Sequence, residues 1–110
     1  MKFLAICKPK DSLTMLTPAV TRPLTEAAFA FMNQSKKAGK LLEYYYSPAG
    51  CIIVMLNYNT AEEWVKEQFM MPILNYYSQE IYPLSNGDEA MKGVIESLKA
   101  AEKMMAGTPK

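Results

Sequence analysis

The stretch from Cys51 to Tyr58 constrains the fold of this chain more than any other. It opens with six apolar residues in a row, Cys-Ile-Ile-Val-Met-Leu, three of them β-branched, and lies between Pro48-Ala-Gly50 and Asn59-Thr60. An apolar run without polar alternation predicts a strand that is buried on both faces. Such a strand needs a covering layer on each side, and the rest of the chain must supply both layers.

The remaining elements are predicted from periodicity. Apolar and aromatic runs indicate strands, whereas helical spacing and capping residues such as Thr60 with Glu63 indicate helices. Thr17 and Pro18 resemble a one-turn helix start. In chain order we expect a strand at 2–8, a helix at 24–38, strands at 41–46 and 51–58, a helix from 61 to just before Pro72, a strand at 73–82 and a long helix at 86–106.

This order is the split βαβ, or ferredoxin-like, arrangement βαββαβ, with an added C-terminal helix in an α+β fold. Right-handed crossovers place the first and third strands in the middle of a four-stranded antiparallel sheet, with both crossover helices on one face. The other face would remain a large apolar patch, so we expect a second copy to cover it as in a dimeric α/β barrel; closure by the last helix is the alternative. The expected single domain spans 1–110, with its core in 1–84, its extra helix in 86–106 and a frayed tail at 107–110.

Composition narrows the possible partners. A net charge of +1, with no basic cluster larger than Lys36-Lys37, argues against nucleic acid. No window approaches the ~20 apolar residues of a membrane span, and no signal peptide is expected. Two cysteines fit a reducing compartment, so we expect a cytoplasmic protein without membrane contact.

Histidine is absent from the sequence. This removes the Ser/His and Cys/His nucleophiles and nearly every ordinary catalytic zinc, copper or haem site. We therefore expect no metal and no cofactor. Any proton transfer would have to use carboxylates, Lys, Tyr, Cys or water.

Seven tyrosines fall in or at the ends of strands two to four. Clustered phenols can line a pocket for a flat apolar ligand, each hydroxyl serving as a hydrogen-bonding group. The alternative is that the rings fill a sheet face or a dimer interface. Alternation predicts one side for Tyr44, Tyr46, Tyr58, Tyr76 and Tyr82 and the other for Tyr45 and Tyr77. The candidate ligand-binding residues are Tyr44, Tyr46, Tyr58 and Tyr76.

Glu43 and Glu80 are the candidate catalytic residues. Both are expected in mid-strand between aromatic residues, where an acid turned inward would have a raised pKa and could transfer protons near neutral pH. The alternative is that they are edge-strand charges that discourage aggregation.

Cys7 and Cys51 form a possible redox pair. Antiparallel pairing of the first and third strands would bring the end of one and the start of the other together. The alternative is that both are small buried hydrophobic residues, since only Lys8 is near enough to lower a thiol pKa. The methionines follow helix and strand faces and are expected to pack the core and interfaces.

Several segments of the chain carry a family resemblance. They are Gly39-Lys40, Tyr46 to Cys51, Asn59 to Glu63, Met71 to Tyr76 and Glu80 to Leu84. Together they resemble the muconolactone isomerase-like group of dimeric α/β-barrel proteins. The resemblance implies cofactor-free proton transfer on a small unsaturated lactone, or the chemistry of relatives that include cofactor-free monooxygenases and stress proteins. No catalytic residue is carried over, because the chain differs in its missing histidine, its proline-punctuated segment after the first strand and its extra helix.

Three functions follow as hypotheses. The first is a cofactor-independent enzyme or binder, of the muconolactone isomerase-like type, for a small hydrophobic compound that is aromatic or lactone-like. The second is a non-catalytic dimeric interaction or stress-response module, and the third is a cofactor-free monooxygenase. A cavity of some hundred cubic ångströms, with Glu43 or Glu80 opening into it, favours the first. A filled interior favours the second.

Overall fold

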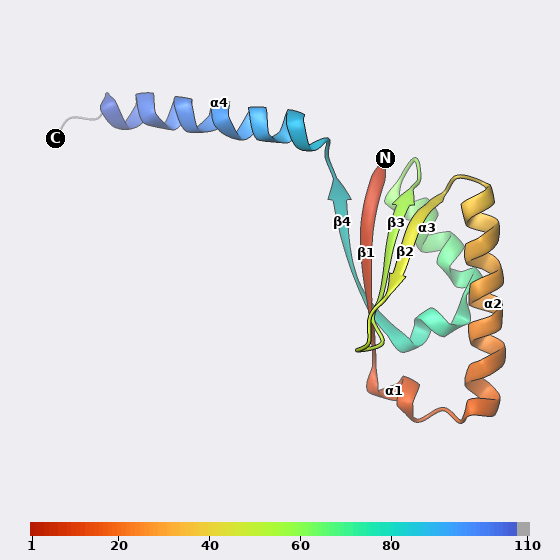
Figure 1. The fold of residues 1–110 in the computed structure, drawn as a ribbon. Coiled ribbons are helices and arrows are strands. Elements are labelled where there is room, and N and C mark those ends of the chain that lie inside the picture. The colour runs from red at the N-terminus through yellow and green to blue at the C-terminus, as the bar shows by residue number, and fades with distance from the viewer. Residues whose placement is uncertain (108–110) are drawn as a thin grey trace.

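The computed structural model describes residues 1–107, so 108–110 of the expected domain and frayed tail lie outside the described part. The chain forms an α+β fold whose elements alternate largely as expected (Figure 1). They are β1 Lys2–Pro9, α1 Asp11–Thr14, α2 Pro18–Lys37, β2 Leu41–Tyr46, β3 Ile52–Asn57, α3 Ala61–Glu67, the 3-10 helices η1 Gln68–Met70 and η2 Pro72–Tyr76, β4 Tyr77–Leu84 and α4 Gly87–Ala106.

The four strands form one antiparallel sheet in the order β2-β3-β1-β4. The apolar strands β1 and β3 are therefore central, and β2 and β4 are the edges, as the crossover rule predicts. Helices α2 and α3 lie on one side of this sheet (Figure 1). The arrangement is compatible with a ferredoxin-like fold.

The core lies between the sheet and these helices. Alternate residues of β1 point into it, and Phe3, Ala5 and Cys7 are at most 3% exposed. Val54 and Leu56 of β3 are buried beside them, since Leu56 pairs with Phe3 and Val54 with Ala5. Helices contribute further buried residues, among them Ala28 and Trp64. We call this side of the sheet the covered face.

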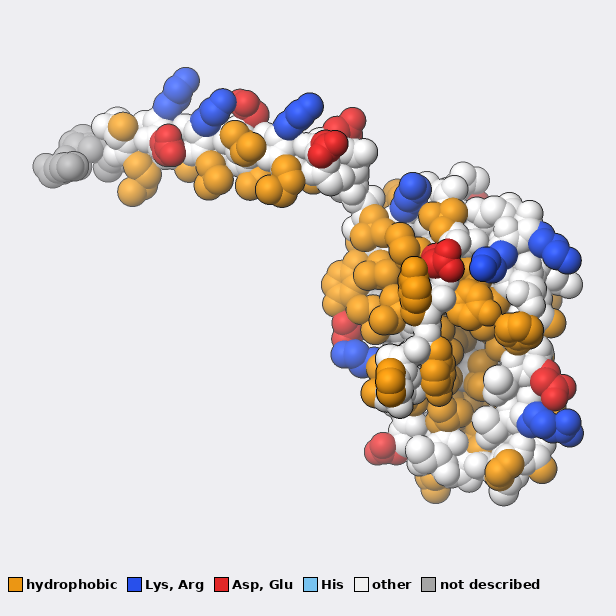
Figure 2. Space-filling view, in the orientation of Figure 1, with side chains coloured by type: hydrophobic (Ala, Val, Ile, Leu, Met, Phe, Trp, Pro, Cys, Tyr) orange, Lys and Arg blue, Asp and Glu red, His pale blue; other side chains and the backbone are white. Residues whose placement is uncertain are grey.

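We call the opposite side the open face, and no element within residues 1–107 covers it. The intervening residues of the central strands point there, and Leu4, Ile6, Ile53 and Met55 are only partly buried by their neighbours. Edge-strand residues Tyr45, Tyr82 and Leu84 are more exposed still. Hydrophobic side chains gather over the strands on the side away from α2 (Figure 2). The two-sided burial expected of the central strands is thus present on one side only.

Local sequence signals explain where the helices start and stop. Gly39, at φ +76°, follows the last turn of α2, a backbone conformation that favours glycine. The Thr60 hydroxyl accepts a hydrogen bond from the Glu63 amide at 3.3 Å, and the Asn86 side chain accepts one from the Glu89 amide at 3.1 Å. Both are N-caps, as expected.

Several predicted boundaries are wrong: α1 was not predicted, α3 ends at Glu67, β4 continues through Pro83 to Leu84, and the largest errors are at the starts of α2 and β4. Helix α2 starts at Pro18 and runs unbroken through Pro23, whereas we expected a separate turn before Leu24. Strand β4 starts at Tyr77 rather than Ile73, because Pro72–Tyr76 forms a 3-10 helix that buries Ile73. Apolar residues in a short run do not distinguish a strand from a buried helical turn.

Leu56 tests the core. It is 1% exposed, so Leu56→Ala should lower the free energy of unfolding by about 2–5 kcal/mol through lost burial and the cavity left behind. Met15 is 83% exposed, so Met15→Ala should change the free energy of unfolding by less than about 0.5 kcal/mol. Urea denaturation followed by circular dichroism measures both, and equal effects would contradict this assignment of the core.

Candidate functional site

A cleft opens between α2 and the covered face at the end of the sheet where β1 leads into α1. It has a volume of about 320 Å³. Side chains of α1, α2, η2 and β3 line it, together with tyrosines of the edge strands: Leu13, Thr21, Thr25, Ala28, Phe29, Met32, Tyr44, Tyr46, Ile52, Ile73 and Tyr77. Four of these residues, Ala28, Met32, Ile52 and Ile73, also border an interior cavity of about 30 Å³. The cleft is therefore the outer part of the space between helix and sheet, whereas the deeper part is nearly filled.

Three tyrosines contribute to the cleft. Tyr44 and Tyr46 pair with Val54 and Ile52, which places them on the covered face. Tyr77 begins β4 on the same side, since Gln79 two residues later pairs with Cys7. Burial, followed by the nearby Tyr46 phenol, raises the pKa of Tyr77, so its hydroxyl stays protonated at neutral pH and can donate a hydrogen bond.

The predicted grouping of the tyrosines is only partly correct. Tyr44, Tyr46 and Tyr58 share the covered face and Tyr45 lies opposite, as expected. Tyr77 lies on the covered face, and Tyr82, which pairs with Leu4, lies on the open face; both placements reverse the prediction. Tyr76 belongs to η2 and does not line the cleft. Sequence alternation fixes relative positions within a strand but not which face each set meets.

Tyr58 lies away from the cleft, in a polar network at the other end of the sheet. Its hydroxyl donates to Glu67 Oε2 at 2.6 Å, and Glu67 Oε1 also accepts from Lys40 Nζ. The Tyr58 ring contacts Trp64, with ring centroids 5.8 Å apart, and the Trp64 indole donates to Gln79. Burial would raise the pKa of Glu67, but the hydrogen bonds from Lys40 and Tyr58 lower it overall. The network satisfies its own polar groups, so it closes this end of the core.

Sequence reasoning did not find Glu67 as the partner of Tyr58. It lies nine residues further on, in the last turn of α3, and no spacing motif connects the two. The shared hydrogen bonds depend on where α3 packs, which only the folded chain shows.

Glu43 and Glu80 both project from the open face. Glu43 pairs with Met55 and Glu80 with Ile6, and both are exposed. The expected inward burial is absent, because both are edge-strand positions whose register turns them away from the helices. Neither residue lines the cleft.

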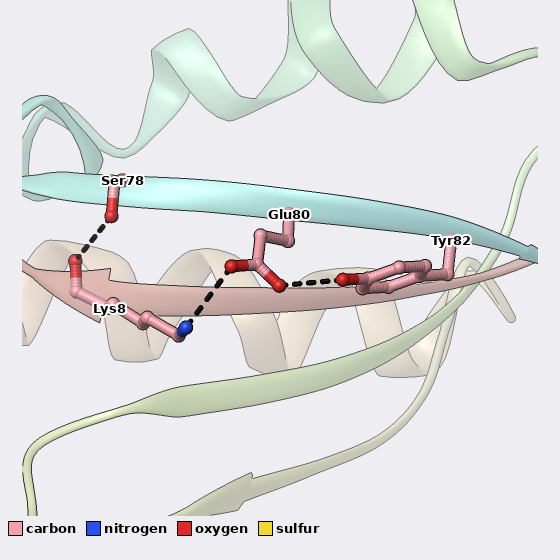
Figure 3. Close-up of polar contacts among 4 residues, drawn as sticks. All are labelled: Lys8, Ser78, Glu80 and Tyr82. Atoms are coloured by element: carbon pink, nitrogen blue, oxygen red, sulfur yellow. Dashed lines mark hydrogen bonds and ion pairs between the residues drawn. The ribbon is translucent and has the colours of Figure 1, made fainter.

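Glu80 forms a cluster with Lys8 and Tyr82 on the open face (Figure 3). The Tyr82 hydroxyl donates to Glu80 Oε2 at 2.7 Å, and Lys8 Nζ donates to Oε1 at 3.1 Å. The Ser78 hydroxyl lies alongside and donates to the Lys8 carbonyl at 3.5 Å. Hydrogen bonds from Tyr82 and then Lys8 lower the pKa of Glu80. The carboxylate is therefore ionised at neutral pH and is a weak proton acceptor.

Cys7 and Cys51 are neighbours, as the antiparallel pairing predicts. Cys7 pairs with Ile52, the residue after Cys51, and both cysteines are free thiols. Burial, with a smaller contribution from Cys51, raises the pKa of Cys7 to about 11. The buried thiol therefore stays neutral, as expected of a small hydrophobic residue.

Neither a metal centre nor a membrane segment is found among residues 1–107. No group of three or more His, Cys, Asp or Glu side chains there could hold a metal ion. None of the helices in that range combines the length and apolar character that crossing a membrane requires. Comparison with protein-family models and with curated proteins finds no match for this chain.

The Cys7 thiol provides a test of this geometry. A pKa raised from 9.0 to about 11 lowers the thiolate fraction at neutral pH by roughly 100-fold, and burial slows modification further. In a Cys51→Ser variant, iodoacetamide should therefore modify the native protein at least ~100-fold more slowly than the urea-unfolded protein. Mass spectrometry measures both rates, and similar rates would contradict the burial of this residue.

The same shift predicts a pH dependence of stability. A group whose pKa is higher in the folded protein than in the unfolded protein contributes its full stabilisation at pH values below the unfolded-state pKa. This contribution is lost as the pH rises through the folded-state pKa. The free energy of unfolding should therefore fall from pH 9 toward pH 11, and less steeply in Cys7→Ala. Equal slopes for the two proteins in this window, measured by urea denaturation, would contradict the shift.

Proposed function

We propose that this protein is a cytoplasmic homodimer of ferredoxin-like protomers that binds a small hydrophobic compound, aromatic or lactone-like, without a cofactor. The observation that carries the proposal is the cleft between α2 and the sheet. Its volume of about 320 Å³ falls at the lower end of ligand pockets, which suits a compound of one or two rings. Its walls combine aliphatic side chains with the phenols of Tyr44, Tyr46 and Tyr77, which supply both flat contact area and hydrogen-bonding hydroxyls.

The lining favours recognition over acid–base turnover. Among residues 1–107, no carboxylate or amine is part of the cleft lining, although Lys36 Nζ lies 5.6 Å from the centre of the Tyr44 ring. The protic side chains of the lining are those of Thr21, Thr25 and the three tyrosines. Neutral hydroxyl groups donate hydrogen bonds but are much weaker proton acceptors than a carboxylate or an amine. An isomerase of the family that the chain resembles would need a stronger base, and Glu43 and Glu80 lie on the other side of the sheet. Binding is thus the part of the first hypothesis that we retain.

Dimerisation through the open faces is the second part of the proposal. The centre of the open face is apolar, with Leu4, Ile6 and Ile53. Charged residues surround this centre, two of each sign: Lys2, Lys8, Glu43 and Glu80. A face with an apolar middle and balanced charges can pair with its own copy about a twofold axis. The packing would also give β1 and β3 their second covering layer.

A non-catalytic dimeric module is the second candidate. The nearly filled interior favours it, because the enclosed cavity of about 30 Å³ holds no more than a water or two. In this case the tyrosines would serve packing and assembly alone. Ligand titration distinguishes the two candidates.

Blocking the cleft should abolish binding. Thr25 is exposed at its mouth, so Thr25→Trp should fill it without disturbing the core, whereas Asn33→Trp places the same ring on α2 outside the cleft. We expect calorimetric titration of small lactones, quinones and 2-naphthol to identify compounds that bind wild type and Asn33→Trp with equal affinity. Their affinity for Thr25→Trp should fall at least ~10-fold, which corresponds to about 1.4 kcal/mol. Absence of binding by wild type across the panel would favour the module instead.

A charge at the centre of the open face should weaken the dimer. Light scattering should report a particle of twice the 12.4 kDa chain mass at micromolar concentration. Ile53→Asp would bury an unpaired carboxylate and should raise the dissociation constant by roughly 100-fold, or about 3 kcal/mol. Val65→Asp, on the outer side of α3, is the matched control and should leave the mass unchanged. A single-chain mass for wild type would refute dimerisation.

A further inference from the structure

Helix α4 extends away from the rest of the molecule (Figure 1). All of its residues are exposed, although it is amphipathic. Its apolar stripe consists of Met91, Val94, Ile95, Leu98, Ala101 and Met105 and is interrupted by Glu102, whereas Lys92, Glu96, Lys99 and Lys103 fall outside the stripe. Hydrophobic side chains accordingly gather along one side of α4 (Figure 2). Amphipathic helices gain most of their stability by packing an apolar stripe, and Gly93 in the interior of α4 costs roughly 0.8–1 kcal/mol relative to Ala. The sequence of α4 is therefore that of a helix that needs a surface to pack on.

The overall dimensions show how much surface is uncovered. A compact chain of this length has a radius of gyration of about 13 Å, whereas this chain has 19.7 Å. Its accessible surface of 8061 Å² exceeds by roughly 1,900 Å² that of a compact monomer of its mass. A stable interface needs only about 800 Å² from each partner. This excess surface area is enough for an extensive dimer interface. The extended shape is that expected of one subunit of an assembly.

The direction of α4 identifies the partner. It leaves the end of β4 toward the open-face side of the sheet, away from α2, so its stripe and the open face border the same region of space (Figures 1 and 2). Only Ser85 and Asn86 connect β4 to α4, and Asn86 caps the helix, since its carbonyl also accepts from the Ala90 amide at 2.9 Å. The connection is thus short, and its hydrogen bonds belong to the first turn of α4.

We propose that α4 is an exchanged arm: in the dimer, the apolar stripe of each α4 packs on the body of the other subunit. This inference rests on the proposed dimer and adds that the arm crosses to the partner. Two sheets packed face to face lie about 10 Å apart, and a 20-residue helix is about 30 Å long. The arm therefore reaches past the partner's sheet to its helical layer. One second copy covers the open face and the stripe together.

Hydrogen exchange tests whether α4 is packed. In the full-length dimer, the α4 amides should exchange at least ~100-fold more slowly than in an unstructured chain. Leu98→Glu places a charge in the stripe and should remove most of this protection. Ala100→Glu makes the same kind of change on the opposite side of α4 and should retain it. Fast exchange of α4 in a protein that light scattering reports as a dimer would overturn the exchanged arm and leave the dimer intact.

Mixed dimers test which subunit the arm contacts. One set of chains carries Cys51→Ser and a nitroxide attached at Ser97→Cys, and it contains no isotope label. These chains are mixed with isotope-labelled chains that carry no nitroxide. Broadened amide signals from residues 1–84 of the isotope-labelled chains are the expected result. In a second sample, chains that carry both the nitroxide and the isotope label are diluted with an excess of unlabelled chains. Broadening of residues 1–84 in this second sample but not in the mixed dimers would show α4 packed on its own subunit and overturn the proposal. A monomer by light scattering would refute both the dimer and the exchanged arm.

Discussion

The structure depends on one constraint, which is that the two central strands carry apolar side chains toward both sides of the sheet. Phe3, Ala5 and Cys7 point into the core, and Leu4 and Ile6 point away from it. A two-layer domain with helices on one side satisfies half of this pattern. The remaining half leaves apolar side chains on the open face, and both proposals above would cover them. In the proposed dimer the two sheets would cover each other, and the helices would form the outer layers.

The same constraint separates the two faces by role. Because the helices cover only one face, the space between α2 and the sheet belongs to a single chain, and the cleft with Tyr44, Tyr46 and Tyr77 forms there. The open face carries the charged and exposed edge residues, including Glu43 and Glu80. The proposed ligand site and the proposed sheet-to-sheet contact lie on opposite faces, so variants at distant positions of the two can be interpreted separately.

The sequence predicts the fold well, because long periodic segments and capping residues act locally. The run from Ile52 to Asn57 lies centrally as expected, and Thr60 and Asn86 cap their helices. Prediction failed where the outcome depends on tertiary packing. Ile73 is buried by a 3-10 turn rather than a strand, because a buried apolar residue fits either one.

The candidate site was predictable in composition but not in geometry. Tyrosines in the strands correctly indicated an aromatic cleft, yet Tyr77 replaces Tyr58 and Tyr76 in its wall. The face that each strand residue meets follows from how the strands pair and turn, which alternation within a single strand does not give. Glu43 and Glu80 point away from the helices for the same reason, and the network of Glu67 with Tyr58 depends on the packing of α3.

The cluster of Lys8, Glu80 and Tyr82 has a consequence for how the open face responds to acidity. Each hydrogen bond in it moves a titration away from neutrality: the pKa of Glu80 is lowered, and the pKa values of Lys8 and Tyr82 are raised by the bond each makes to Glu80. The charges of this cluster are therefore constant around neutral pH. Contacts between copies that involve the cluster would then be sensitive chiefly to ionic strength.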